Sequence, residues 1–345
     1  AENSVTITGG NHTNIYGGWT TGTGSTATDK GDSTGNKVTV NGSAAVSGTV
    51  YGGYTDVTGG KATDSEVTID KEIAGAVVGG KALGEASGNI VTVKANTGAV
   101  TGGDGATTNN NTVNLTQANV TGSVTGGNGA TANENTVNID RVNVTGTITG
   151  GTADGTGNTL NVAGTNTAAN IVGFQKVAFN TSGVAAHGTV LNLTGGAQTK
   201  VDWTTLTVTG TAVKPLTLLK NDSGIDLVGY TGAAKSETTD TTETNVDVRK
   251  NNDGKVTEIT YEGYQFAGVT APVISGTDVY GGISRAGNAT HANAITVNGD
   301  YTNVYGGHTS GMSTTAVEKK NSHDNTVTIT GGTIGNVYGG YTAAA

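Results

Sequence analysis

The chain has 345 residues, of which 58 are Gly, 2 are Pro and none is Cys. The lack of Cys excludes a disulfide framework and any thiolate metal site. The formal net charge of −9 at pH 7 argues against a nucleic-acid partner and against docking on an anionic membrane, because both favour a basic surface.

Short alternating strands recur along the chain, each with two aliphatic residues separated by a Thr or an Asn. This alternation predicts strands with one buried face. The nine predicted strands are residues 5–7, 38–40, 67–69, 91–93, 113–115, 137–139, 160–162, 295–297 and 327–329. An Asn stands two positions before the first aliphatic residue in eight of them, and Ser65 takes that place in the other. These residues are Asn3, Asn36, Asn89, Asn111, Asn135, Asn158, Asn293 and Asn325.

A second motif recurs later in the units and consists of an aliphatic residue, one further residue and a Gly pair. The Gly pairs are residues 17–18, 52–53, 79–80, 102–103, 126–127, 150–151, 281–282, 306–307 and 339–340. The repeat is 22 to 24 residues long in the middle units and about 30 residues at both ends. Units of this length with strands, turns and no helix each form one coil of a β-helix. The sequence therefore predicts an all-β, right-handed parallel β-helix, also called a β-solenoid.

The repeat also predicts where the side chains point. Alternate Val and Ile residues are expected to face inward and to stack in columns, with Thr and Asn facing outward. The repeated Asn is expected to form a hydrogen-bonded ladder at a turn. We expect the Gly pair to supply a positive φ at a corner of the coil where a Cβ would clash.

We expect the chain to form one continuous solenoid with three segments. These are repeats in 1–169, an irregular part in 170–265, and repeats in 266–345. In the irregular part, the polar residues 235–244 are predicted to form a loop or hairpin tip, and residues 256–261 a returning strand. Insertions rich in polar residues at 19–35 and 308–324 follow Gly pairs and are expected to be exposed loops.

The chain resembles the passenger regions of bacterial autotransporters, the type V secreted adhesins built on a right-handed parallel β-helix. The Asn-x-Val-Thr-Val and Val-Tyr-Gly-Gly-Tyr-Thr repeats carry this resemblance over nearly the whole chain. The stretch from Ile171 to Gly224 is similar to a linking segment common in such passengers. The translocator barrel of the family is absent from the sequence. The resemblance implies an exported protein, displayed on the bacterial surface or secreted, and Ala1 fits the residue left after removal of a signal peptide.

Candidate catalytic and metal-binding motifs are weak. The five His residues have no metal-ligand spacing and are expected to be solvated loop residues. Asp222, Ser223 and Gly224 match part of a serine-protease motif, but a turn between two strands is the preferred interpretation. Residues 102–107 and 126–131 lack the Asp of a calcium-binding nonapeptide. The carboxylates of units 89–157 share no unit-relative position, which argues against a polysaccharide-degrading site. We therefore expect no metal, no cofactor and no catalytic residues.

Aromatic residues beside the Gly pairs are the best candidates for a ligand-binding site. Parallel stacking would gather them into ladders, which stabilise a sheet face or offer a platform for a sugar or protein partner. The candidate residues are Tyr16, Trp19, Tyr51, Tyr54, Tyr280, Tyr305, His308, Tyr338 and Tyr341.

The expected function is that of an adhesin passenger that binds a host protein, a glycan or neighbouring cells through its long face and its two loops. A first alternative is a self-associating structural solenoid in fibres or biofilm matrix, because residues 5–10 and 327–332 are identical. A second alternative is a polysaccharide-degrading β-helix enzyme. Each alternative keeps the same fold, so the fold does not choose among them.

Overall fold

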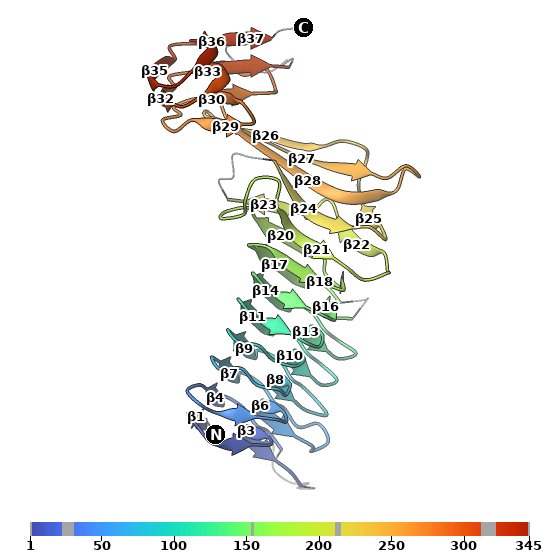
Figure 1. Ribbon diagram of the computed structural model, residues 1–345. Coiled ribbons are helices and arrows are strands. Elements are labelled where there is room, and N and C mark those ends of the chain that lie inside the picture. The colour runs from blue at the N-terminus through green and yellow to red at the C-terminus, as the bar shows by residue number, and fades with distance from the viewer. Residues whose placement is uncertain (1, 23–30, 153–154, 211–214, 312–321, 344–345) are drawn as a thin grey trace. The chain divides into compact units, whose positions relative to one another are not determined.

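The computed structural model describes residues 2–22, 31–152, 155–210, 215–311 and 322–343. Within these ranges every regular element is a β-strand, and most strands pair in parallel with the equivalent strand of the next coil (Figure 1). The predicted all-β parallel β-helix is confirmed.

The chain divides into two compact units. The first unit contains Ala1–Gly210, Thr217–Gly232 and Val248–Ile259, and the second contains Thr211–Leu216, Ala233–Asp247 and Thr260–Ala345. Each unit is described by itself below. The expectation of one continuous solenoid stays a prediction.

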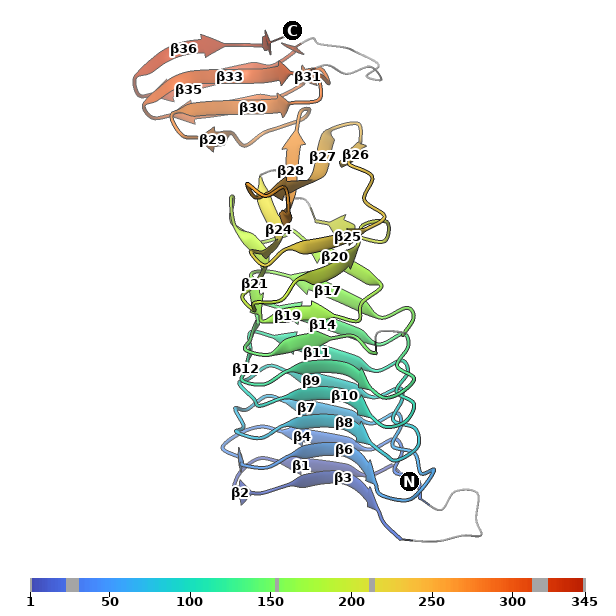
Figure 2. The ribbon, with the colours of Figure 1, turned by 90° about the vertical axis from the view of Figure 1, so that its right-hand side faces the viewer.

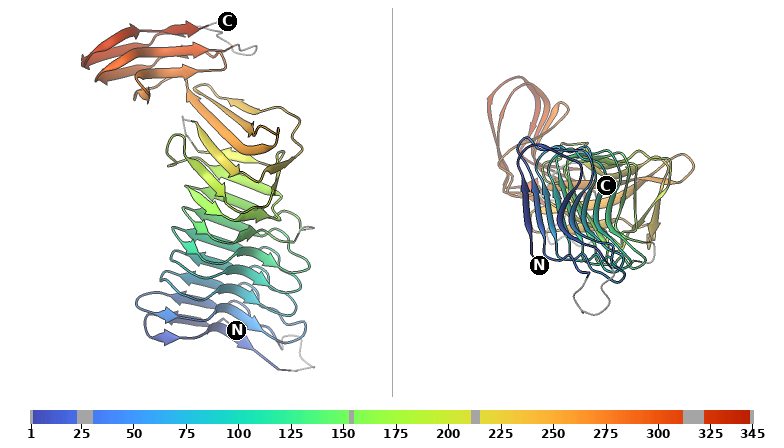
Figure 3. Two further views of the ribbon diagram at one scale, coloured as in Figure 1. Left: turned by 45° about the vertical axis from the view of Figure 1, so that its right-hand side comes forward. Right: turned by 90° about the horizontal axis from the view of Figure 1, so that it is seen from below.

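Two long parallel sheets and one shorter sheet form the first unit, as its stacked strands show in Figures 2 and 3. The β1 sheet contains β1 (Ser4–Ile7), β4 (Lys37–Val40), β7 (Glu66–Ile69), β9 (Ile90–Val93), β11 (Thr112–Thr116), β14 (Thr136–Asp140), β17 (Thr159–Ala163), β20 (Lys176–Asn180) and β23 (Thr207–Thr209). The β3 sheet contains β3 (Ile15–Thr20), β6 (Val50–Thr55), β8 (Val77–Lys81), β10 (Val100–Asp104), β13 (Val124–Asn128), β16 (Thr147–Thr149) and β19 (Asn170–Val172). The β12 sheet contains β12 (Asn119–Val120), β15 (Asn143–Val144), β18 (Asn166–Ala168), β21 (Thr189–Leu193) and β24 (Leu216–Asn221). Two short pairs complete the unit: β2 (Asn11–His12) with β5 (Ala45–Val46), and β22 (Thr199–Asp202) with β25 (Ile225–Val228).

The irregular segment supplies the later strands of these sheets and a hairpin. Strands β20, β21 and β24 extend the parallel ladders. The polar tract 235–244 forms an antiparallel hairpin of β26 (Lys235–Thr238) with β27 (Thr242–Lys250), and β28 (Val256–Gln265) is the predicted returning strand. The expected hairpin is therefore confirmed.

The second unit has its own parallel stack. The β30 sheet contains β29 (Val273–Ser275), β30 (Asp278–Ser284), β33 (Tyr301–Ser310), β36 (Ile334–Tyr338) and β37 (Tyr341–Ala343). Two further parallel pairs are β31 (Thr290–His291) with β34 (Ser322–His323), and β32 (Ala294–Asn298) with β35 (Thr326–Gly331). Here β29 pairs antiparallel with β30, and the other pairs are parallel.

The inward columns of aliphatic residues form the core, as predicted. Val38, Val67 and Val91 pair in register and are at most 1% exposed. Each buried aliphatic side chain of this size contributes about 1.5–3 kcal/mol to stability. Because neighbouring coils carry the same or a similar aliphatic side chain at the same place, the buried columns continue from coil to coil.

The predicted Asn ladder exists, and it is buried. In the middle coils the Nδ2 of Asn89 donates to Oδ1 of Asn111 at 3.0 Å, and Asn111 donates likewise to Asn135 at 3.0 Å. Each Oδ1 also accepts the backbone N–H of the preceding Asn, for example Asn89 N at 3.0 Å from Asn111 Oδ1. All three residues are 0% exposed. The ladder thus satisfies the backbone at the point where each coil turns into its first strand.

The positive φ predicted for the Gly pairs is wrong. None of the 18 paired Gly residues is among the described residues with positive φ; they lie inside or directly beside the strands of the β3 and β30 sheets. The predicted clash of a Cβ at the pair is confirmed. A Cβ on Gly102 would lie 2.9 Å from Cβ of Asn111, and one on Gly103 would lie 2.7 Å from its Nδ2. The Gly pair therefore makes room for the buried Asn that opens the next coil and for the backbone carbonyls of Gly126 and Ala86 in the neighbouring coils, which would lie closer still.

The two predicted long loops lie largely outside the described residues, which omit 23–30 and 312–321. Their described flanks are fixed to the coils. Asp32 Oδ1 accepts the N–H of Lys61 at 2.9 Å, and Ser310 Oγ donates to Ser284 O at 3.2 Å.

Candidate binding surface

The predicted site residues gather in two patches, one in each unit. The first aromatic patch, on β3 and β6, contains Tyr16, Trp19, Tyr51 and Tyr54. The second aromatic patch, on β30, β33, β36 and β37, contains Tyr280, Tyr305, His308, Tyr338 and Tyr341. In-register parallel pairing brings the equivalent residues of neighbouring coils side by side.

The Gly pair also explains why two aromatic residues three positions apart share one outer face. In β3 both Gly17 and Gly18 are buried, so the usual alternation of inward and outward residues is interrupted once. Tyr16 before the pair and Trp19 after it therefore both face outward. The same pattern holds in β6 and β33.

Stacked and perpendicular rings alternate in the first patch. Tyr16 stacks on Tyr51 with ring centroids 5.0 Å apart and planes at 8°, and on Trp19 at 4.8 Å and 25°. Tyr54 stands perpendicular to both Tyr residues, at 5.6 Å from Tyr16 and 5.3 Å from Tyr51. These are the favoured geometries for aromatic pairs.

The second patch repeats this arrangement with one more coil. Tyr305 lies between Tyr280 at 5.0 Å and Tyr338 at 4.9 Å, with both pairs stacked. His308 and Tyr341 form a parallel outer column at 5.0 Å and 22°. The His308 ring is perpendicular to Tyr280 and Tyr305, at 85° and 87°.

This geometry limits how the patches can bind a ligand. The faces of Tyr16 and Tyr305 are covered on both sides by other rings, so these residues cannot stack on a sugar or a base. What they present outward is ring edges and hydroxyls. Trp19 is 59% exposed and Tyr341 37% exposed, so these two rings offer the largest accessible aromatic area. The inner rings, such as Tyr16 and Tyr305, are covered by other rings and stabilise the sheet. The outer rings, such as Trp19 and Tyr341, are the ones accessible to a ligand.

Burial raises the pKa of three phenol groups in the patches. Burial first, and then the neighbouring Tyr51 and Tyr54 hydroxyls, raises the pKa of Tyr16. Burial followed by the Asp278 carboxylate raises the pKa of Tyr280 and of Tyr305. The hydroxyls therefore act as hydrogen-bond donors and acceptors.

The imidazole of His308 is held in its neutral form. Burial, followed by the positive charge of Arg285, lowers the pKa of His308 below its ordinary range. Arg285 is itself placed 5.3 Å over the ring of Tyr264. A neutral imidazole offers one donor and one acceptor beside the aromatic rings.

Charged side chains border the first patch. Lys81 follows Tyr54 in the same column of the β3 sheet, and Asp104 follows Lys81. Lys81 Nζ lies 3.0 Å from Asp104 Oδ2, and this hydrogen bond raises the pKa of Lys81. Asn128 also donates to Asp104, at 2.8 Å. The column that begins with Trp19 and Tyr54 thus changes from aromatic to polar side chains at Lys81, in the third coil.

Side chains of the two motifs considered for catalysis and for calcium binding interact with other residues of the fold. Ser223 lies in the turn between β24 and β25, and its Oγ donates to Gly195 O at 3.2 Å, as expected of a turn residue. Asp104, in the sequence that resembles a calcium nonapeptide, forms an ion pair with Lys81 and accepts a hydrogen bond from Asn128. In the described ranges no group of three or more His, Asp and Glu side chains is arranged to hold a metal ion.

The expectation of five solvated loop His residues is wrong for four of them. His12 lies in β2, His308 in β33, and His291 and His323 stack at 5.4 Å across the β31–β34 pair. His187 alone occupies an exposed turn. Parallel register explains the His291–His323 stack, because the two residues occupy the same position in successive coils.

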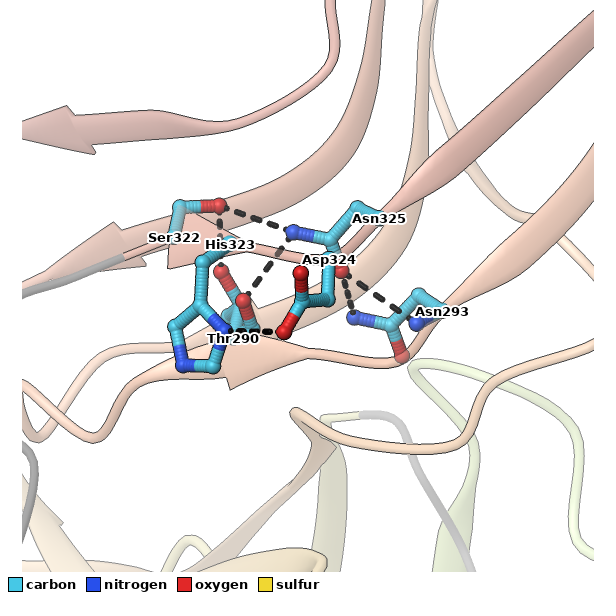
Figure 4. Close-up of polar contacts among 6 residues, drawn as sticks. All are labelled: Thr290, Asn293, Ser322, His323, Asp324 and Asn325. Atoms are coloured by element: carbon cyan, nitrogen blue, oxygen red, sulfur yellow. Dashed lines mark hydrogen bonds and ion pairs between the residues drawn. The ribbon is translucent and has the colours of Figure 1, made fainter.

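Figure 4 shows a polar network around the Asn ladder of the second unit, which Asn293 and Asn325 form. Asn293 Nδ2 donates to Asn325 Oδ1 at 2.7 Å, and Asn325 Nδ2 donates to Thr290 O at 3.0 Å and Ser322 Oγ at 3.1 Å. His323 Nδ1 lies 2.9 Å from Asp324 Oδ2 on the outer side. The network repeats the buried ladder of the first unit.

Sequence reasoning missed one buried carboxylate. Glu243, in the tract expected to be a loop tip, is only 5% exposed. It accepts hydrogen bonds from the backbone N–H of Arg285 at 2.6 Å and of Ala286 at 3.2 Å. Ser284 Oγ at 2.9 Å and Asn288 Nδ2 at 2.7 Å donate to its other oxygen. No sequence signal marks it, because its partners lie more than 40 residues later.

No described helix is long and apolar enough to cross a membrane. Open hollows do occur on the outer faces, including one in the first unit beside the outward ladder of Asn114, Asn138 and Asn161.

Comparison with protein-family models, with curated proteins and with solved structures finds no match to this chain. The similarity to autotransporter passengers accordingly stays a prediction carried by the sequence repeats.

Proposed function

We propose that this chain is an adhesin passenger, exported to the bacterial surface or secreted, that binds a host protein, a glycan or a neighbouring cell. The observation that carries the proposal is the pair of outward aromatic patches at equivalent coil positions in the two units. Exposed aromatic residues provide large contact area at low entropic cost, which suits a binding surface. The polar column of Lys81, Asp104 and Asn128 that borders the first patch offers further donors and acceptors.

A binding role is favoured over catalysis because the titratable groups near the patches are neutral Tyr and His or charge-paired Lys and Asp. The hydroxyl of Ser223 is bonded to a backbone carbonyl inside a turn, away from the His and Asp geometry that a nucleophile needs. Release of reducing ends from a polysaccharide panel would contradict the proposal and favour the enzyme alternative.

The test is a glycan and host-protein array, followed by cell-binding assays, with the purified 345-residue chain. We expect Tyr54→Ala and His308→Ala to weaken binding of the ligand found by about tenfold or more, because each removes an outer-column ring. Ile90→Ala is the matched control, since Ile90 is 42% exposed on the β1 sheet, outside both patches. Equal binding by all three variants would contradict a role for the patches.

Exposure at the cell surface is tested separately. Bacteria that express the chain from its natural gene should lose it when intact cells are treated with a protease that cannot enter them. Retention of the chain after such treatment, with full loss after lysis, would place it inside the cell and contradict the proposal.

A further inference from the structure

The outer face of the β1 sheet carries two rows of side chains that run across successive coils. The parallel register places each residue of a row beside its equivalent in the next strand. We call them the Asn row, which contains Asn114, Asn138, Asn161, Ala178 and Thr207, and the Asp row, which contains Thr116, Asp140, Ala163, Asn180 and Thr209. Each row shortens to Ala once, at Ala163 in β17 and at Ala178 in β20. The two short side chains leave room between longer neighbours.

An open hollow lies over these two Ala residues. It has a volume of about 360 Å³ and is lined by both rows in β11, β14, β17 and β20, together with Thr209. The inward neighbours Val162 and Phe179 are 1% and 0% exposed, so the hollow ends at the sheet and does not enter the core. Its volume is near the lower end of the range for small-molecule sites, about 300–1,000 Å³, and suits a single small ring.

The Asn row has a direction, and it ends with an open acceptor at the hollow. Asn138 donates from Nδ2 to Oδ1 of Asn114 at 2.7 Å, and Asn161 donates likewise to Asn138 at 2.7 Å. Each Oδ1 thus accepts from the amide of the following coil. Ala178 follows Asn161 in register and has no amide. Asn161 Oδ1 therefore accepts from no side chain of the described residues.

Two further polar groups, both of the Asp row, line the same hollow. Asn180 Oδ1 accepts the backbone N–H of Ser182 at 3.0 Å, which leaves its Nδ2 as a donor. Asp140 binds the guanidinium of Arg141 through Oδ2 at 2.8 Å, which leaves its Oδ1 as an acceptor. The hollow therefore offers acceptors on Asn161 and Asp140 and a donor on Asn180, one from each of three successive strands.

The chemistry of the lining favours a neutral ligand rich in hydroxyl groups. Asp140 is the only charged residue among the described residues that line the hollow, and its charge disfavours an anion. Phe179 is fully buried and offers no ring on which a base could stack. A peptide cannot add a strand here, because β17 already pairs with β14 on one side and with β20 on the other. Hydroxyl groups, which both donate and accept, match the open amide and carboxylate atoms.

We propose that this hollow binds one neutral sugar residue. Hydroxyl groups of the sugar donate to Asn161 Oδ1 and Asp140 Oδ1, and another accepts from Asn180 Nδ2. The apolar face of the sugar ring rests on the methyl groups of Ala163 and Ala178. The proposal rests on the binding function proposed above, to which it adds a ligand class and a third site that is separate from both aromatic patches.

The first test titrates the 345-residue chain with the methyl glycosides of glucose, galactose and mannose, followed by saturation-transfer NMR. We expect saturable binding of at least one of these neutral sugars. The uronic acid that corresponds to the best ligand should bind at least about tenfold more weakly, because its carboxylate meets Asp140. Failure of all three sugars to bind, or equal binding of the uronic acid, would overturn the proposal.

The second test is Ala178→Asn, which separates loss of the site from loss of the fold. The new amide would continue the Asn row, donate to Asn161 Oδ1 and fill the hollow. It should abolish sugar binding while the melting temperature stays equal or rises. Asn161→Ala should weaken binding about tenfold or more by removing the acceptor. Ala294→Asn, at an exposed position of β32 in the second unit, is the matched control and should bind as the unmodified chain does.

Unchanged sugar binding by Ala178→Asn would overturn the proposal. Tyr54→Ala and His308→Ala lie outside the hollow and should keep full sugar binding; loss of the sugar in these variants would place it at the patches and overturn the proposal as well. If Ala178→Asn keeps the sugar while the patch variants lose the array ligand, the sugar site fails and the proposed function stands. If the patch variants keep every array ligand while Ala178→Asn loses the sugar, the role of the patches fails and the sugar site stands.

Discussion

At the scale of single residues, the coil depends on a polar side chain inside its core. A buried Asn is costly unless its amide is fully hydrogen-bonded. Here Asn111 accepts from the N–H and Nδ2 of Asn89 and donates to Ala86 O and Asn135 Oδ1, each at 3.0 Å. The Asn and the Gly pair are therefore linked, since a Cβ on either Gly would crowd the Asn side chain as well as a backbone carbonyl of a neighbouring coil.

Replacing Asn111 by Ala should destabilise the first unit by about 3 kcal/mol, because buried groups of Asn89 and Ala86 lose their partners. Asn138→Ala is the control, since Asn138 belongs to the half-buried outward ladder, and should cost less than about 1 kcal/mol. Urea unfolding followed by circular dichroism measures both. Equal costs would contradict the importance of the inner ladder.

Gly103→Ala should be destabilising by about 3 kcal/mol, because the new Cβ would lie 2.0 Å from Ala86 O and 2.7 Å from Asn111 Nδ2. Gly196→Ala, where no atom lies within 4 Å of the new Cβ, should be nearly neutral. Thermal unfolding of the two variants compares them directly. A neutral Gly103→Ala would mean that the pair is not needed for space.

At the scale of elements, two features of the second unit depend on contacts between strands. Glu243 at the start of β27 receives four hydrogen bonds from residues 284–288 and so fixes the turn after β30. His308 in β33 belongs to a column of rings that β30, β33 and β37 build together. Neither feature can form from a single strand.

Glu243→Gln should increase hydrogen exchange at residues 284–288, because the amide nitrogen that replaces one carboxylate oxygen faces donors and cannot accept from them. We expect a loss of about 2 kcal/mol in the stability of that turn. Glu237→Gln, on the exposed face of β26, serves as the control and should leave exchange unchanged. Unchanged exchange in both variants would show that the turn holds without the carboxylate.

The lowered pKa of His308 predicts a pH dependence. Below the ordinary His pKa of 6.5, the unfolded chain binds a proton that the folded His308 does not, so stability falls as the pH drops from about 7 to 5. His308→Phe should remove that part of the decline and keep the ring. The difference in melting temperature between the two proteins across this range is the measurement. Parallel curves would contradict the prediction.

At the scale of each unit, stability is a sum of contacts between neighbouring coils, as in other solenoids. In the first unit the middle coils are covered on both sides, whereas the first coil is covered on one side only. Exposed ion pairs such as Lys37 with Glu66 and Lys94 with Asp70 link successive coils. Such exposed pairs contribute little individually, so the inward columns dominate.

Hydrogen exchange should therefore be slowest in the middle of the first unit. We expect the backbone N–H groups of β11 and β14 to exchange at least tenfold more slowly than those of β1, because opening a middle coil breaks two interfaces. Mass spectrometry of peptides from these strands measures the ratio. Equal protection throughout would indicate a single cooperative unit without end fraying.

The sequence by itself determined the coil: strand positions, inward columns, the Asn ladder, the clash of a Cβ at the Gly pairs, and a loop or hairpin tip at 235–244. These follow because side-chain alternation is local and because the repeat brings like residues to like positions. The tertiary structure alone decided which atoms crowd the Gly pairs, where Glu243 is buried, how four His residues enter strands, and which ring faces remain open. Each of these depends on contacts between different coils or strands, such as Ser284 with Glu243 and His291 with His323, whose distance and orientation no local pattern specifies.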